Sequence, residues 1–170
     1  MKLQRFPRLP IAPDGWRFVL PLAALTVLIL LLKLYLAAGF VFAATVFVIY
    51  FFRDPERKPP RIEGAIVSAA DGRVATVEQV EHDGLAGGQA WRISVVLSLF
   101  DVHVNRSPIA GRVESVEYRP GRFHNAFFEI SARENERNRI RVGNGTVAVV
   151  IDQIAGVLAR RVLCSCRPGD

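Results

Sequence analysis

The sequence predicts a mainly β domain, of the sandwich or barrel kind, preceded by an N-terminal α-helical membrane hairpin. Two observations predict this fold class: a nearly unbroken apolar stretch at residues 18–52, and short apolar runs cut by Gly, Pro, Asn and Asp after residue 62. Long apolar stretches are typical of membrane helices, and closely spaced short runs without a long amphipathic helix are typical of β domains. The predicted parts are a basic N-terminal segment (1–17), the hairpin (18–52), a linker (53–62) and the β domain (63–170).

The apolar stretch fits two helices better than one. A single helix over residues 18–52 would be about 52 Å long, whereas a hydrocarbon core is about 30 Å thick. We therefore expect a break between Lys33 and Gly39. Arginines and lysines flank both ends of the stretch, and the positive-inside rule then places both flanks in the cytoplasm. The expected location is the cell (inner) membrane with the β domain on its cytoplasmic side; a re-entrant hairpin and a signal peptide are the alternatives.

Charge and cysteine content exclude some classes of function. The formal net charge is +6, but residues 1–52 hold five Lys or Arg against one acid, which leaves 17 against 15 in the remainder. Because the excess belongs to the membrane-proximal part, nucleic acid is not an expected partner. The two cysteines, Cys164 and Cys166, are too few for a zinc site, so we predict reduced thiols and no metal.

Turn residues bound the expected strands. Residues 73–80 follow a turn at Asp71-Gly72, residues 91–100 are rich in β-branched side chains, and Asn144-Gly145 is typical of a β-hairpin. A last apolar run at 153–166 is followed by a turn, and such a turn normally leads to a partner strand. We therefore expect the β domain to be truncated at its C-terminal end.

Several residues are candidates for chemistry. Asp101 and His103 would share one face of a strand, so that the carboxylate could orient the imidazole for acid–base catalysis. The Arg160-Arg161 pair suits phosphate because guanidinium groups bind it through two hydrogen bonds. Each also has a structural interpretation: Asp71 as a turn residue, His103 as a core histidine, and the arginines as a solvated pair.

Taken together and in order, several short sequence segments indicate one protein family much more specifically than any single residue does. FFRDPER after the apolar stretch, ADGRV, FDVHVNRSP, YRPGRF, NERN, and QIAG followed by ARR resemble the short prokaryotic branch of the phosphatidylserine decarboxylase family along nearly the whole chain. The resemblance implies a lyase that converts phosphatidylserine to phosphatidylethanolamine. It also implies a proenzyme that cuts itself at a Gly-Ser bond, so that the serine becomes a pyruvoyl group, which forms a Schiff base with the substrate amine.

The resemblance assigns roles to individual residues. Asp71 and His103 match the acid and the histidine that activate the serine for self-cleavage, and His103 or a neighbour would protonate the carbon that loses carbon dioxide. Arg106 stands where longer relatives carry a second histidine, so roles divided between two histidines do not transfer to this chain. The candidates for binding the substrate and its phosphate are Asn105, Arg106, Arg160 and Arg161.

One feature departs from the family pattern. No Gly-Ser dipeptide occurs in the 170 residues. The chain is therefore expected to be most of the large chain and to be inactive alone, with the serine supplied by a second polypeptide or a continuation. The expected partners are phosphatidylserine, the membrane, a small pyruvoyl-bearing α chain and further copies of the chain. The alternative is a non-catalytic membrane-anchored β domain, a remnant or a scaffold; a lipoyl or biotinyl carrier is disfavoured because no lysine follows Lys58.

Overall fold

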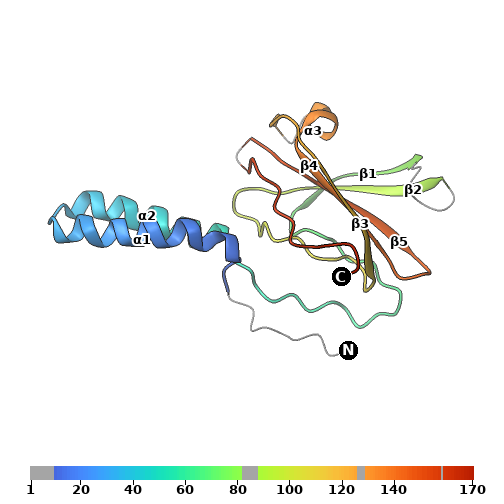
Figure 1. Ribbon diagram of the computed structural model, residues 1–170, viewed down its shortest axis with the longest axis horizontal. Helices are drawn as coiled ribbons and strands as arrows, with labels where there is room; N and C mark the ends of the chain where they lie inside the picture. The colour runs from blue at the N-terminus through green and yellow to red at the C-terminus, as the bar shows by residue number, and fades with distance from the viewer. Residues whose placement is uncertain (1–9, 82–87, 126–128, 158) are drawn as a thin grey trace. The chain divides into compact units, whose positions relative to one another are not determined.

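The computed structural model describes residues 10–81, 88–125, 129–157 and 159–170 (Figure 1). Within these residues, two apolar helices come first, and five strands in two antiparallel sheets follow. The predicted fold class is confirmed: a sheet-rich domain follows an apolar helical segment. The chain divides into two compact units. The first comprises the described residues up to 60 with 70–72 and 97–105, and the second comprises 61–69, 73–96 and the described residues from 106 onward.

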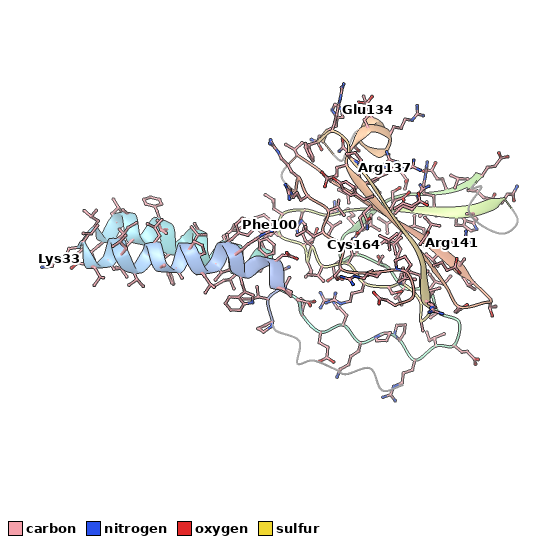
Figure 2. The ribbon with its side chains drawn as sticks, viewed as in Figure 1. Lys33, Phe100, Glu134, Arg137, Arg141 and Cys164 are labelled. Atoms are coloured by element: carbon pink, nitrogen blue, oxygen red, sulfur yellow. The ribbon has the colours of Figure 1, made fainter. Side chains whose placement is uncertain are left out.

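The first unit is built on a helical hairpin. A short 3₁₀ turn (Pro13–Gly15) leads into α1 (Trp16–Leu31), and α2 (Tyr35–Phe51) returns alongside it (Figure 1). Lys33 lies at the tip of the hairpin, with a positive φ of 60° (Figure 2). The break is thus narrower than the predicted span from Lys33 to Gly39, because Gly39 lies inside α2.

Backbone hydrogen bonds join the two ends of the hairpin. The Ala12 N–H donates to the Phe52 carbonyl at 2.7 Å, and the Asp54 N–H donates to the Pro10 carbonyl at 2.8 Å. Gly15 allows this close approach, because a Cβ at that position would lie 2.6 Å from the Phe52 Cβ. The chain therefore enters α1 and leaves α2 at the same end of the hairpin.

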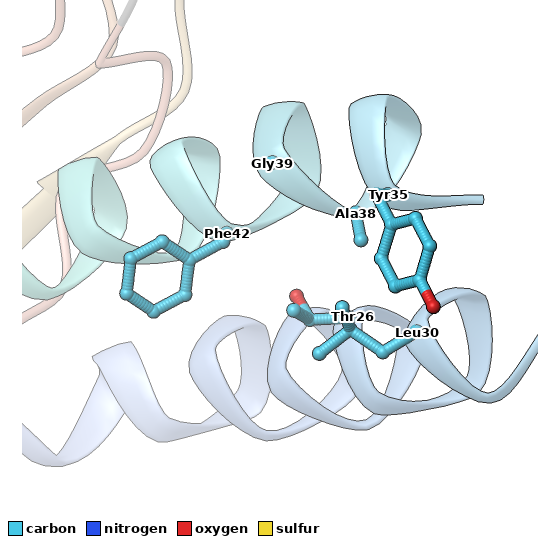
Figure 3. A pocket seen from close by; sticks show the side chains of 6 residues that line it. All are labelled: Thr26, Leu30, Tyr35, Ala38, Gly39 and Phe42. Atoms are coloured by element: carbon cyan, nitrogen blue, oxygen red, sulfur yellow. The ribbon is translucent and has the colours of Figure 1, made fainter. Parts of the chain in front are cut away.

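Small and hydroxyl side chains fill the contact between the helices. Val19, Thr26, Ala38 and Thr45 are buried, while most of the larger apolar side chains of both helices are exposed. The two threonine hydroxyls donate to the Leu22 and Val41 carbonyls at 2.8 Å, so neither is left unpaired in apolar surroundings. A small apolar pocket beside Gly39 lies between the helices (Figure 3). Among the described residues, the helical stretch Pro13–Leu31 is long and apolar enough to cross a membrane, and α2 is shorter.

The second unit contains both sheets. Strands β1 (Arg73–Glu81) and β2 (Gln89–Val96) form one antiparallel pair. The other sheet has the order β3-β4-β5, formed by β3 (Arg112–Arg119), β4 (Arg137–Gly143) and β5 (Ala148–Ile154), with the short helix α3 (Glu129–Glu134) before β4. The apolar core of this unit lies against the three-stranded sheet and contains Ile109, Val113, Val116, Ile140, Val142, Val149 and Ile151.

The central strand β4 shows why this sheet forms. Ile140 and Val142 are buried, whereas the alternate residues Arg139 and Arg141 are partly exposed, which is the period of two expected of a strand with one buried face. Arg139 pairs with Asp152 of β5 through two hydrogen bonds of 2.7 Å. This cross-strand ion pair helps to set the register between β4 and β5.

The predicted hairpin at Asn144-Gly145 is confirmed. Gly143 pairs with Ala148, Gly145 has a φ of 88°, and the Asn144 Oδ1 accepts the N–H groups of Thr146 and Val147. The apolar run expected after β5 is different, because its described residues beyond Ile154 form no strand. Their backbone groups bond elsewhere: the N–H groups of Ala155 and Val162 donate to the carbonyl and the carboxylate of Glu136.

Candidate functional site

A tight turn precedes the candidate histidine. In the first unit, the Asp101 N–H donates to the Ser98 carbonyl at 3.1 Å, and the Ser98 N–H donates to the Asp101 carboxylate at 2.7 Å. The Phe100 N–H also lies 3.3 Å from the Ser98 Oγ. The pKa of Asp101 lies below its usual value, chiefly because its carboxylate accepts hydrogen bonds from Ser98. Asp101 is therefore an ionised residue that closes a turn.

The backbone of this turn orients His103. Its Nδ1 lies 3.0 Å from the Asp101 carbonyl oxygen, which can only accept, so Nδ1 carries the proton and Nε2 carries the lone pair. The expected strand does not form at residues 101–103, and the Asp101 carboxylate bonds to Ser98. The imidazole was predicted to be oriented by the Asp101 carboxylate. In the structure the Asp101 carbonyl orients it instead, because the carboxylate accepts the Ser98 N–H that closes the turn.

Phe51 covers one side of the imidazole. The two ring centroids are 4.2 Å apart, and the planes meet at 30°. The imidazole is half-buried, and this burial lowers the pKa of His103 below its usual value of 6.5. Its Nε2 makes no further hydrogen bond within the described part of the chain. The result is a neutral imidazole at neutral pH, with an oriented lone pair that can accept a proton.

The end of α2 holds the histidine loop in place. Arg53 donates to the Phe100 carbonyl at 2.6 Å and to the Tyr50 carbonyl at 2.8 Å, while its guanidinium lies 3.9 Å from the centre of the Tyr50 ring. The Tyr50 hydroxyl also donates to the Phe100 carbonyl, at 3.2 Å. These contacts join the FFRDPER segment to the FDVHVNRSP segment, which lie about fifty residues apart in the sequence.

Asp71 is paired with Arg57. The Arg57 Nε lies 3.0 Å from the Asp71 Oδ2, and the guanidinium makes a second, shorter contact with the same oxygen. The pair raises the pKa of Arg57, chiefly through its hydrogen bond with Asp71. Arg57 was not among the predicted site residues, although it stands in the FFRDPER segment. The signal that could have found it is an arginine shortly after a long apolar stretch, but no local sequence pattern indicates that its partner is Asp71.

The predicted site residues are divided between the two units. Asp71, Asp101, His103 and Asn105 belong to the first unit, and Arg106, Arg160 and Arg161 belong to the second. The Asn105 Oδ1 is buried and finds no donor within the described residues, which is a costly state for an amide oxygen. Arg160 donates to the Val157 carbonyl at 3.0 Å, and both arginines of the pair are exposed.

Asn135 is a residue whose importance the sequence understated. Its side chain is only 1% exposed, and it joins two distant segments. Oδ1 accepts the His124 N–H, and Nδ2 donates to the His124 and Ala155 carbonyls, each at 2.8 Å. The NERN segment, to which Asn135 belongs, therefore connects His124, the residue that follows YRPGRF, with Ala155 of QIAG in the second unit. The buried Asn135 amide, with its hydrogen bonds made, thus holds these loops together.

No group of three or more His, Cys, Asp or Glu side chains that could hold a metal ion occurs among the residues described. Cys164 and Cys166 are exposed free thiols. Although Cys166 is exposed overall, partial burial of its thiol, more than the neighbouring Cys164, raises the pKa of this group.

Comparison with known proteins identifies the family. The sequence model of the family described as phosphatidylserine decarboxylase matches residues 44–170. The chain belongs to the phosphatidylserine decarboxylase family. It is 47% identical over 162 residues to the phosphatidylserine decarboxylase proenzyme of Symbiobacterium thermophilum, which covers 94% of this chain and 74% of the relative. The proenzymes of Carboxydothermus hydrogenoformans and Ruegeria pomeroyi are each 43% identical, over 92% and 95% of this chain and 73% and 75% of their own lengths. The family is one of lyases.

The low pKa of His103 predicts a loss of stability in acid. The unfolded chain, in which a histidine titrates near 6.5, binds the proton before the folded state does. The stabilisation that the neutral His103 gives the folded state is therefore fully present above about pH 6.5. It is lost as the pH falls through the lowered pKa that His103 has in the folded state. Thermal unfolding in detergent should show a Tm that falls more steeply below this pH for the wild type than for His103→Asn. Equal pH dependence of the two proteins would contradict the prediction.

Proposed function

We propose that this chain is the large-chain portion of a phosphatidylserine decarboxylase, which converts phosphatidylserine to phosphatidylethanolamine at the cytoplasmic face of the cell membrane. The observation that carries the proposal is the oriented, half-buried His103 on Phe51, in a loop bonded to the end of α2. A phospholipid substrate explains why an acid–base group lies beside an apolar helix. Membership of the family and the names of the relatives support the same reaction.

The residues described fit the pyruvoyl group that the family implies. His103 offers an Nε2 without a partner in the described part of the chain, and Asn105 offers a buried acceptor oxygen without a donor. An amide N–H or a substrate ammonium group would supply that donor. When bound, a pyruvoyl group supplies the electron sink for the loss of carbon dioxide. Since the 170 residues contain no Gly-Ser dipeptide, the proposal places the serine outside them and makes these residues inactive by themselves.

The chain's own residues then have separate tasks. His103 accepts a proton at Nε2 from the serine hydroxyl during self-cleavage. In the decarboxylation it takes up a proton from water at the same atom and donates it to the carbon that loses carbon dioxide. Burial helps the second task, because a histidine with a lowered pKa gives up its proton more readily. Asp71, held by Arg57, supplies a negative charge for the self-cleavage step. Asn105 binds a donor of the substrate or of the pyruvoyl chain, and Arg106, Arg160 and Arg161 are the candidates for the phosphate.

The test is intact-mass analysis of the protein purified from its native membrane, together with an assay of carbon dioxide release from phosphatidylserine. We expect a co-purifying small chain with an N-terminal pyruvoyl group, and decarboxylation by the two chains together. Finding only the 170-residue chain, with no decarboxylation, would support the alternative of a non-catalytic membrane-anchored remnant or scaffold.

In a proenzyme that includes the Gly-Ser segment, Arg57→Gln is expected to slow self-cleavage by about tenfold at most, because it removes the charge-assisted hydrogen bonds that hold Asp71, and exposed ion pairs contribute little. Lysine at this position should restore part of the rate, since it keeps the charge but offers a single point of contact. The fraction of processed chain, measured by mass after a pulse of synthesis, reports the rate. Lys58→Gln removes a charge from the same linker without touching Asp71 and is the matched control. Wild-type processing of Arg57→Gln would exclude this role.

The proposed topology makes a labelling prediction. The helical stretch Pro13–Leu31 has 19 residues and is about 28 Å long, close to the thickness of a hydrocarbon core. In a background of Cys164→Ser and Cys166→Ser, Lys33→Cys should therefore react with an impermeant maleimide from outside the cell. Lys58→Cys should react only after the cytoplasmic side is opened. Protection of position 33 from both sides would instead indicate a re-entrant hairpin in one leaflet.

A further inference from the structure

The turn before His103 has unusual residues at its centre. Turns favour Gly, Pro, Asn, Asp and Ser, yet the central residues here are Leu99 and Phe100. Their exposed fractions are 38% and 66%, so the fold of the described residues does not bury them. The hydrogen bonds between Ser98 and Asp101 close the turn from both ends. Two apolar side chains are thus exposed at the centre of a hydrogen-bonded turn.

The turn is attached to the end of a membrane helix. Both Arg53 and Tyr50 donate to the carbonyl of Phe100 itself. Figure 2 shows Phe100 at the base of the helical hairpin, at the opposite end from Lys33. Tyrosine and arginine are typical anchors at the boundary between lipid and water. If α2 lies in the bilayer, the backbone of Phe100 therefore lies at the depth of the lipid headgroups.

From this placement we propose that Leu99 and Phe100 form a membrane-contacting turn that enters the interfacial layer of the bilayer beside α2. The proposal rests on the membrane association in the proposed function. The turn is bonded to the end of α2, whose large apolar side chains are mostly exposed, and Lys58 in the linker that follows suits anionic headgroups. These features favour a lipid bilayer over an apolar surface of another protein.

The contact would set the depth of the candidate histidine. His103 bonds to the carbonyl of Asp101, the last residue of the turn, and packs on Phe51, the last residue of α2. Both supports of the imidazole therefore lie next to lipid-facing residues. A turn held in the interface keeps Nε2 level with the headgroup of a phospholipid that remains in the bilayer, so the substrate need not be extracted into water.

The experiment measures depth with a fluorophore whose emission depends on polarity. The full chain, with Cys164→Ser and Cys166→Ser, is labelled at Phe100→Cys and reconstituted in vesicles of phosphatidylcholine and phosphatidylglycerol. Lipids that carry a nitroxide near the headgroup serve as quenchers. Phe47→Cys in α2 is the positive control, and Tyr118→Cys, an exposed aromatic position in β3, is the matched negative control.

We expect blue-shifted emission and loss of intensity with nitroxide lipid at position 100, as at position 47, and neither effect at position 118. Quenching at position 47 but not at position 100 would overturn the membrane-contacting turn and leave the membrane association of α2 intact. A blue shift at 100 without quenching would indicate a protein partner and would also overturn it. Absence of quenching at both 47 and 100 would overturn the membrane association itself. Because the readout needs no catalytic activity, it is independent of failure of the proposed reaction.

Discussion

Replacing His103 by asparagine is expected to lower the rate of phosphatidylserine decarboxylation by about 100-fold or more, because general acid–base catalysis contributes roughly 10²–10⁴-fold. Asparagine can still donate to the Asp101 carbonyl, so the turn keeps its shape, but it has no group at the place of Nε2. The measurement is carbon dioxide release by protein from the native membrane, together with any chain that co-purifies with it.

Two readouts separate the roles of this histidine. Unprocessed His103→Asn would assign the residue to self-cleavage, and a processed but inactive variant would assign it to proton return after the loss of carbon dioxide. His124→Asn is the matched control: the backbone N–H and carbonyl of His124 bond to Asn135, and these bonds do not depend on its imidazole. Activity of His103→Asn within about threefold of the wild type would exclude a catalytic role, given the size of such effects.

Asn135→Asp is expected to destabilise the second unit by about 3 kcal/mol or more, since each buried group left without its partner costs roughly 1–3 kcal/mol. The exchange keeps the acceptor for the His124 N–H but removes the two hydrogen bonds that Nδ2 donates. It also places a negative oxygen against the carbonyls of His124 and Ala155. Burial makes this unfavourable, because the side chain is 1% exposed.

Asn144→Asp provides the comparison for this variant. It makes the same change of charge in the same unit, but Asn144 acts through its Oδ1, which accepts two backbone N–H groups, and aspartate preserves that acceptor. Thermal or denaturant unfolding in detergent should therefore show a large loss of stability for Asn135→Asp and little change for Asn144→Asp. Equal stability of the two variants would contradict the assigned role of Asn135.

Local signals explain which features were predictable. The apolar helices follow from the length and composition of one continuous stretch, and the β4–β5 hairpin follows from the tendency of Asn-Gly to adopt a turn. The order of the short segments was sufficient to indicate the family, which the comparison confirmed. In each case the residues that carry the signal are neighbours in the chain, so their spacing in the sequence already contains the information.

Long-range pairing explains what the sequence missed. Arg57 meets Asp71 across 14 residues, and Asn135 meets Ala155 across 20, and neither pairing follows from a local pattern. The strand expected at Asp101 and His103 failed for a related reason, because Ser98 takes the carboxylate that was expected to orient the imidazole. A polar side chain bonds to whichever donor or acceptor the folded chain places within hydrogen-bond distance. Several such partners compete for each side chain, so its sequence neighbours do not determine the partner.

The sequence by itself determined the apolar helical segment, the main strands, the family and His103 as the candidate histidine. Only the tertiary structure decided the state of that histidine: which nitrogen carries the proton, which ring covers it, and the direction in which its pKa moves. The physical reason is that residue identity determines what a side chain can do, whereas burial and hydrogen-bond partners, which depend on contacts between distant residues, determine its protonation and direction.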